Sequence, residues 1–206
     1  MNTKSTLTTL ALLLGTAAAQ AQTLGAWNNV GDVLTNGGTV QMSTAYDSDT
    51  PGPLSSHGAE DIAVLEPAAG VSTYGLDLFG PAYEGSLIQQ SFNVLAGQSL
   101  SFDWSFSTLD ADFHDAAFVA LNGQATTLNT TAGASSGHFS TVFGSAGTVN
   151  LAIGVVDTGD YIGNSTLTIS NVTLTAAVPE PATYAMLLGG LAVVGFGALR
   201  RRRVSP

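Results

Sequence analysis

Apolar and polar residues alternate with a period of two along three stretches of the chain, the pattern of strands with one buried face. The first series consists of Leu100, Phe102, Trp104 and Phe106. Residues 149–155 form the second series and residues 167–174 the third, where a change of phase at Ser170-Asn171 predicts a β-bulge. Further strands are predicted at 87–94, 115–121, 124–129 and 138–143.

Turn signals separate these predicted strands. Asn122-Gly123 is typical of a two-residue hairpin, and Ala96-Gly97-Gln98 predicts another hairpin turn before the Leu100 strand. One short helix is predicted near 56–66, whereas residues 22–60 are placed only loosely. Strands at intervals of about 8–12 residues favour an all-β fold, a single β-sandwich or jelly-roll-like domain over residues 22–178.

The N-terminus has a different pattern from this middle part. Lys4 precedes an apolar run that ends at Ala19, and Ala19-Gln20-Ala21 has the small residues of a signal-peptidase site. We therefore predict a signal peptide over residues 1–21, exported by the Sec machinery and cleaved by signal peptidase after Ala21. The alternative is a short buried helix at the start of the domain, which leaves the lysine and the cleavage pattern unexplained.

The C-terminal segment 179–206 combines three features in order. Pro179, Glu180 and Pro181 are followed by eighteen uncharged residues, 182–199. The segment ends in the basic cluster Arg200, Arg201, Arg202 and Arg203. As a helix, residues 182–199 would be about 27 Å long, close to the hydrocarbon core of about 30 Å. We therefore predict a transmembrane helix there, and the arginines would keep its far end cytoplasmic.

This tail resembles the PEP-CTERM sorting signal of Gram-negative bacteria. The resemblance implies recognition and cutting near Pro-Glu-Pro by an exosortase, a membrane-embedded transpeptidase-like enzyme, and an association with exopolysaccharide and biofilms. It also implies an inner-membrane intermediate with a periplasmic domain, followed by delivery to the cell surface or extracellular matrix. An ordinary permanent anchor behind a Pro-rich linker is the alternative.

The middle domain also resembles domains that often precede such tails. The residues that carry this resemblance include Glu84-Gly85-Ser86, Leu100-Ser101-Phe102-Asp103-Trp104 and Leu167-Thr168-Ile169-Ser170-Asn171-Val172. It supports the β-sandwich prediction and implies no activity.

Charge narrows the range of partners. Residues 22–178 contain fourteen acidic side chains and no Lys or Arg. Nothing in that segment neutralises phosphates, which excludes nucleic acid and argues against nucleotide chemistry. Cysteine is absent, so the domain must be held together by core packing without disulfides.

Acidic residues gather in two predicted turns, which makes calcium the one cofactor that the sequence favours. The five candidate ligands are Asp110, Asp112, Asp115, Asp157 and Asp160. Crowded oxygen ligands with no nearby base suit Ca²⁺, and the two turns could converge. Short acidic side chains also favour turns for local reasons, and this alternative stays open.

No catalytic constellation is recognised in the sequence. The three histidines occur without an H-E-x-x-H motif, and there is no G-x-S-x-G nucleophile elbow. We therefore expect a non-catalytic surface or matrix protein associated with extracellular polysaccharide. One alternative is a carbohydrate-binding module for neutral glycans, with Tyr161 as the best surface aromatic. A weaker one is a glycan hydrolase or lyase with paired carboxylates.

Overall fold

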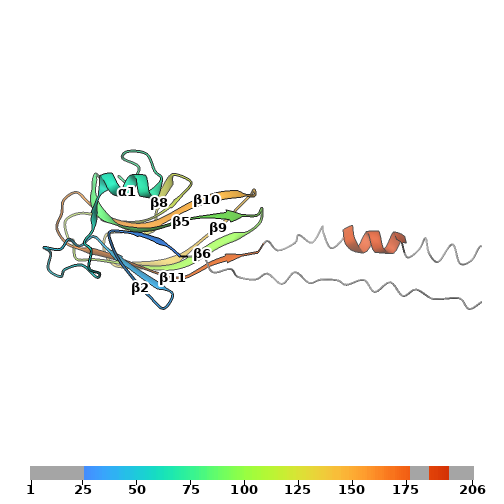
Figure 1. The fold of residues 1–206 in the computed structure, drawn as a ribbon, viewed down its shortest axis with the longest axis horizontal. Coiled ribbons are helices and arrows are strands. Elements are labelled where there is room, and N and C mark those ends of the chain that lie inside the picture. The colour runs from blue at the N-terminus through green and yellow to red at the C-terminus, as the bar shows by residue number, and fades with distance from the viewer. Residues whose placement is uncertain (1–25, 177–185, 195–206) are drawn as a thin grey trace, which may run out of the picture.

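Two antiparallel β-sheets pack face to face in the computed structural model, which describes residues 26–176 and 186–194 (Figure 1). One sheet has the strand order β2-β3-β11-β6-β9. The other has the order β1-β5-β10-β7-β8, and β4 pairs with β5 beside it. The predicted all-β sandwich is therefore confirmed for the part of the chain that the structure describes.

The strands vary in length, and the longest ones lie in the middle of each sheet. The short N-terminal ones are β1 (Asn28–Val30), β2 (Asp32–Asn36), β3 (Thr39–Ser43) and β4 (Glu60–Asp61). The others are β5 (Ala82–Val94), β6 (Ser99–Thr108), β7 (Ala116–Leu121), β8 (Gln124–Thr127), β9 (Ser135–Val142), β10 (Gly147–Thr158) and β11 (Ser165–Thr175). From β5 onward the chain alternates between the sheets, except at the β7–β8 hairpin, and this is the winding of a jelly roll.

The main core lies between the two sheets, where the predicted alternation points apolar side chains inward. Phe102 of β6 and Ile153 of β10 are fully buried there. Trp104 of β6 packs against the same core and lies opposite Gly137 of β9, the edge strand of this sheet. A Cβ atom at Gly137 would lie 2.8 Å from the indole ring, so the glycine makes room for it. Each large apolar side chain buried in this way contributes about 1.5–3 kcal/mol.

A second, smaller core lies between the outer face of the β5–β10–β7 sheet and the helix α1 (Ile62–Ala69). Leu65 of the helix packs there with Leu87 and Phe118 of the sheet. The helix starts later than the predicted 56–66 because Asp61 caps it, accepting a hydrogen bond from the Ala63 amide at 2.8 Å.

Two of the predicted irregularities are confirmed. Asn122 and Gly123 have φ values of 50° and 83° and form the hairpin between β7 and β8. The β6–β11 register shifts between Ser170 and Thr173, and Asn171 there has a φ of 55°.

The hairpin predicted at Ala96-Gly97-Gln98 is wrong. The turn exists, with Gly97 at a φ of 81°, but it joins β5 and β6, which belong to different sheets. The Gly97 amide donates to the Phe143 carbonyl and the Phe143 amide donates to the Gln98 carbonyl, at 2.7 and 2.9 Å. These bonds align β6 with β9 instead of β5, so the turn carries the chain from one sheet to the other.

Several predictions for the termini lie outside the described residues. The signal peptide, residues 1–21 with Ala19 and Ala21, is among them, as are Pro179–Pro181 and Arg200–Arg203. Within the predicted span 182–199, residues 186–194 are helical. Among the helices described in this structure, none has both the length and the apolar character needed to cross a membrane.

Candidate functional site

One end of the sandwich carries a row of carboxylates across four neighbouring chain segments. The strand register places Glu84 of β5 opposite both Asp157 of β10 and Asp61 of β4. The pairing of β10 with β7 runs to Val156 and Ala116. Asp157 follows Val156 and Asp115 precedes Ala116, so these two aspartates also lie side by side. We call Asp61, Glu84, Asp157 and Asp115 the carboxylate row.

Three members of this row are buried inside the end of the sandwich. Glu84, Asp157 and Asp115 are each 1% exposed. Asp157 lies two residues beyond Val155, a member of the main core, and side chains two apart on a strand share a face. The three carboxylates therefore point between the sheets, whereas Asp61 is exposed at the sheet edge.

Only part of this buried charge is hydrogen-bonded. Asp115 accepts from the Thr158 amide at 3.0 Å and from the Ser165 hydroxyl at 2.5 Å. Within the described residues, Oδ1 of Asp157 and Oε2 of Glu84 are buried and have no hydrogen-bond partner. A buried polar atom without a partner is costly, so these two oxygens need another explanation.

The buried Asp32 shows how the same fold satisfies a carboxylate. Its side chain accepts hydrogen bonds from the amides of Leu54 and Ser55, each at 2.7 Å, and from the Ser43 hydroxyl. These bonds also hold the 50–58 loop onto β2 and β3. Unlike Asp32, Glu84 and Asp157 each keep one buried oxygen without a donor, and among the described residues Oε1 of Glu66 and Oδ2 of Asp110 share this property.

Burial and mutual repulsion raise the pKa values of the row. Burial, the larger cause, raises the pKa of Asp157 to about 9, and the charges of Asp115 and Glu84 add to it. The pKa of Glu84 rises to about 7 and that of Asp115 to about 6, again mainly through burial. The Tyr46 hydroxyl near Glu84 opposes the rise of the Glu84 pKa, and burial raises the pKa of Tyr46 itself to about 12. At neutral pH the row therefore resists full ionisation.

Four of the five aspartates predicted as calcium ligands come together at this end. Asp110 and Asp160 are near enough to raise the pKa of both Asp115 and Asp157 by charge repulsion. Asp112, by contrast, is exposed on the surface of its turn. Among the residues that the structure describes, no three His, Cys, Asp or Glu side chains converge closely enough to hold a metal by themselves.

Sequence reasoning missed Glu84 as a member of this cluster. The strand was predicted to begin at residue 87, but β5 begins at Ala82. Extending the inward series back from Ile88 through Ser86 would have reached Glu84 on the same face. The partnership with Asp157, 73 positions along the chain, depends on strand register, which no local pattern contains.

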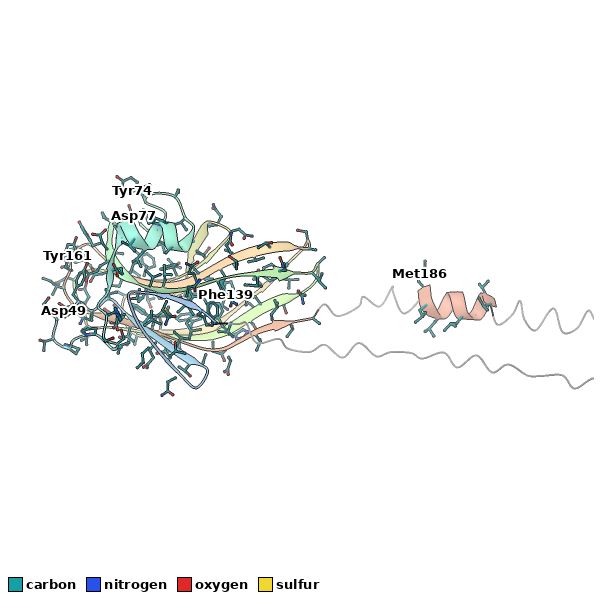
Figure 2. All side chains as sticks on the ribbon, viewed as in Figure 1. Asp49, Tyr74, Asp77, Phe139, Tyr161 and Met186 are labelled. Atoms are coloured by element: carbon teal, nitrogen blue, oxygen red, sulfur yellow. The ribbon has the colours of Figure 1, made fainter. Side chains whose placement is uncertain are left out.

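Aromatic residues border the acidic end. The β5–β10 register shifts beside Asp157, leaving Tyr83 as the extra residue between the pairs that Glu84 and Ala82 make. The ring of Tyr83 lies 4.9 Å from that of Tyr161, which is 52% exposed. Tyr161 and Asp49 both lie at this end of the sandwich in Figure 2.

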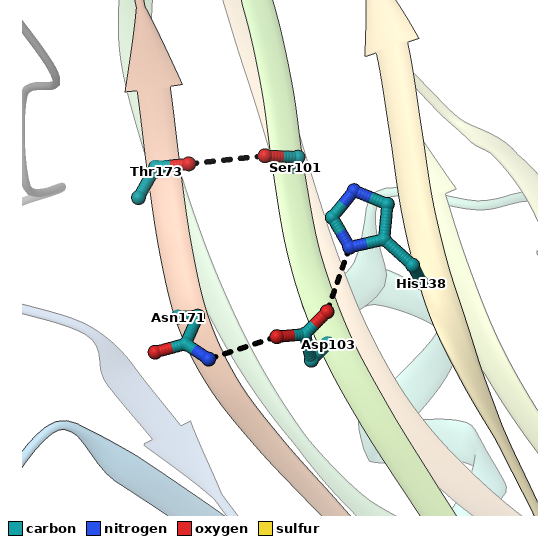
Figure 3. Close-up of polar contacts among 5 residues, drawn as sticks. All are labelled: Ser101, Asp103, His138, Asn171 and Thr173. Atoms are coloured by element: carbon teal, nitrogen blue, oxygen red, sulfur yellow. Dashed lines mark hydrogen bonds and ion pairs between the residues drawn. The ribbon is translucent and has the colours of Figure 1, made fainter.

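A second polar cluster lies on the outer face of the other sheet, where Figure 3 shows it. Asp103 of β6 contacts His138 of β9 at 2.7 Å and accepts from the Asn171 amide group at 2.8 Å. Both bonds lower the pKa of Asp103. The sequence reasoning did not pair these residues, which lie 35 and 68 positions apart. His114 lies outside this second polar cluster. Its ring stacks on that of Phe79, with 3.9 Å between the ring centroids.

The described fold and its charged end define an acidic β-sandwich domain. Residues 177–203, directly after this domain, match the PEP-CTERM protein-sorting motif. The chain is therefore a PEP-CTERM sorting-domain protein, and the motif implies export, a membrane-anchored intermediate and an exosortase as the processing partner. No curated protein and no solved structure matches the chain.

Proposed function

We propose that this protein is an exported, non-catalytic surface or extracellular-matrix protein whose sandwich domain is delivered by exosortase processing. The observation that carries the proposal is the position of the sorting motif. The last strand ends at Thr175 and the motif begins at residue 177, so the folded domain is joined directly to the tail. Residues 1–21 act as the signal peptide, and 182–199 as a temporary inner-membrane anchor with Arg200–Arg203 in the cytoplasm.

The orientation of β11 relates the carboxylate row to the tail. Ser165, at the start of β11, donates to Asp115 of the row. Thr175 ends the same strand at the far end of the sandwich (Figure 1). Eleven residues of strand span about 35 Å, so the acidic end lies about that far from the point where the tail begins. A chain anchored through its tail would present its acidic end away from the membrane.

The charges of the domain constrain how it associates with extracellular polysaccharide. A domain with fourteen acidic and no basic side chains repels anionic polymers unless cations mediate the contact. Glycan hydrolysis is disfavoured, because the paired carboxylates Glu84 and Asp157 are 1% exposed and a sugar chain has no access to them. Binding to the matrix, through cations or to neutral sugars, is the proposed role.

Fractionation of native cells tests the delivery step. With the exosortase present, the sandwich domain is expected at the cell surface or in the matrix; without it, the domain is expected in the inner-membrane fraction. Equal distribution in the two strains would contradict the proposal. Addition of EDTA to washed cells tests the cation-mediated form of matrix binding, which predicts release of the domain.

Binding of neutral glycans is the second candidate, and Tyr161 is the observation that favours it. The residue lies beside a surface hollow lined also by Asp49, Leu109 and Asn164, which combines an aromatic face with polar groups. A glycan array of the protein tests this function. Loss of a signal in Tyr161→Ala, with retention in a Tyr74→Ala control, would support it, because Tyr74 is 77% exposed but lies elsewhere.

A further inference from the structure

We propose that a Ca²⁺ ion binds between Glu84 and Asp157, within the acidic end of the sandwich. Binding at this position does not depend on processing of the tail. Glu84 and Asp157 are direct cross-strand partners on the inward face of β5 and β10. Like charges directly opposite each other in an antiparallel pair are destabilising, and burial makes the repulsion larger.

The unpartnered oxygens favour ligand binding at this position. Oε2 of Glu84 and Oδ1 of Asp157 are both buried and have no hydrogen-bond partner in the described residues. Asp32 and Asp115, in the same protein, receive two or three donors each. The fold therefore supplies donors to its other buried aspartates and leaves oxygen atoms free at the centre of the row.

No lysine or arginine can take the role of the cation. Residues 22–178 contain neither Lys nor Arg, so an ion pair of the usual kind is unavailable to Glu84 and Asp157. The titratable groups that surround the pair add negative charge or remain neutral. They are Asp110, Asp115 and Asp160 beside Asp157, and Tyr46, Asp49 and Asp61 beside Glu84.

The donor set fits Ca²⁺ better than other common cations. All the groups are hard oxygen donors, which excludes a preference for metals that take sulfur or imidazole. Ca²⁺ accepts six to eight ligands in irregular geometry and commonly completes its shell with backbone carbonyls and water. Glu84 and Asp157 would supply the charged ligands and carbonyls and water the rest, because no group of three His, Cys, Asp or Glu side chains in the described residues could hold a metal.

The close contact between β5 and β10 places the pair rigidly. A Cβ atom at Gly85, next to Glu84, would lie 2.1 Å from the Val155 carbonyl oxygen. Only glycine allows the two backbones to approach in this way, and the β-bulge beside Asp157 follows directly. Bulges and glycines of this kind are frequent next to functional sites.

Thermal unfolding of the purified full chain in mild detergent, after removal of metals by chelation, tests the site. Calcium at about 100 times its dissociation constant is expected to raise Tm by about 5 °C or more at pH 8. Potassium chloride of equal ionic strength controls for general screening of the acidic domain. Binding should also release protons from the pair, because the ion requires the ionised carboxylates.

The variants make the test specific. Asp157→Asn should abolish the calcium-dependent rise in Tm, and Glu84→Gln should do the same if the first variant folds poorly. Asp112→Asn, at an exposed aspartate outside the row, should retain the full rise. The proposal is overturned if calcium raises Tm no more than potassium chloride does, or if both row variants retain the calcium effect.

Discussion

Glu84 and Asp157 lie directly opposite each other on adjacent antiparallel strands, two buried carboxylates in a domain without lysine or arginine. This arrangement distinguishes the acidic end from an ordinary charged surface. Exposed carboxylates are solvated and need no partner, whereas these two must share a proton or bind a cation.

The stability of the metal-free protein should fall as the pH rises from about 4 to about 9. Asp157, Glu84 and Asp115 have pKa values of about 9, 7 and 6 in the fold, all above their ordinary values. The folded state therefore binds more protons than the unfolded state over this range, and the free energy of unfolding decreases with pH. We expect a loss of several kcal/mol between pH 5 and pH 8, measured by chemical unfolding in EDTA.

Asp157→Asn provides the control for this pH dependence. The variant removes the group with the largest pKa shift, so its unfolding free energy should change much less over the same range. A wild-type stability that is flat or rises between pH 5 and pH 8 would show that the row is solvated and not buried as described.

Gly85→Ala should destabilise the domain through the backbone. The added methyl group would meet the Val155 carbonyl oxygen at 2.1 Å, so β5 and β10 must separate locally. We expect a cost of about 2–3 kcal/mol. In Gly147→Ala, at the start of β10, the added methyl group has nothing within 4 Å, so the free energy of unfolding should change by less than about 0.5 kcal/mol. Equal effects of the two variants would be inconsistent with the close approach.

Adjacent residues of β6 should differ sharply in their effect on stability. Phe102 is fully buried in the main core, and Phe102→Ala should cost about 3–5 kcal/mol. Its neighbour Asp103 points to solvent, where it bonds His138 and Asn171. Asp103→Asn should leave Tm nearly unchanged, because exposed charged contacts contribute little. A large fall in Tm at position 103 would show that the outer-face contacts of Asp103 stabilise the fold.

The alternation of residues was sufficient to predict the central strands. Leu100 to Phe106 alternate because one face of β6 is buried. Val149 to Val155 alternate in sequence although both faces of β10 are covered beyond Leu151, the outer one by the small residues Ala152 and Gly154; both strands form as expected. The short strands between residues 28 and 61 were not predicted. β1 and β4 contribute two or three mostly exposed residues each, too few to establish a period.

The arrangement of the sheets could not be read from local sequence. Gly97 predicts a tight turn, but whether the next strand pairs with the last one or crosses to the other sheet depends on distant partners such as Phe143. The carboxylate row could not be predicted for the same reason. Its acidic turns were visible in the sequence, whereas the cross-strand pairing of Glu84 with Asp157 comes from the winding of the chain.

Mass spectrometry of the protein from native cells, with and without the exosortase, would show directly whether the tail is removed. We expect a C-terminal peptide that ends near Pro179-Glu180-Pro181 only when the exosortase is present, and an N-terminal peptide that begins at Gln22. Retention of Arg200–Arg203 in both strains would contradict this expectation and would make the tail a permanent anchor.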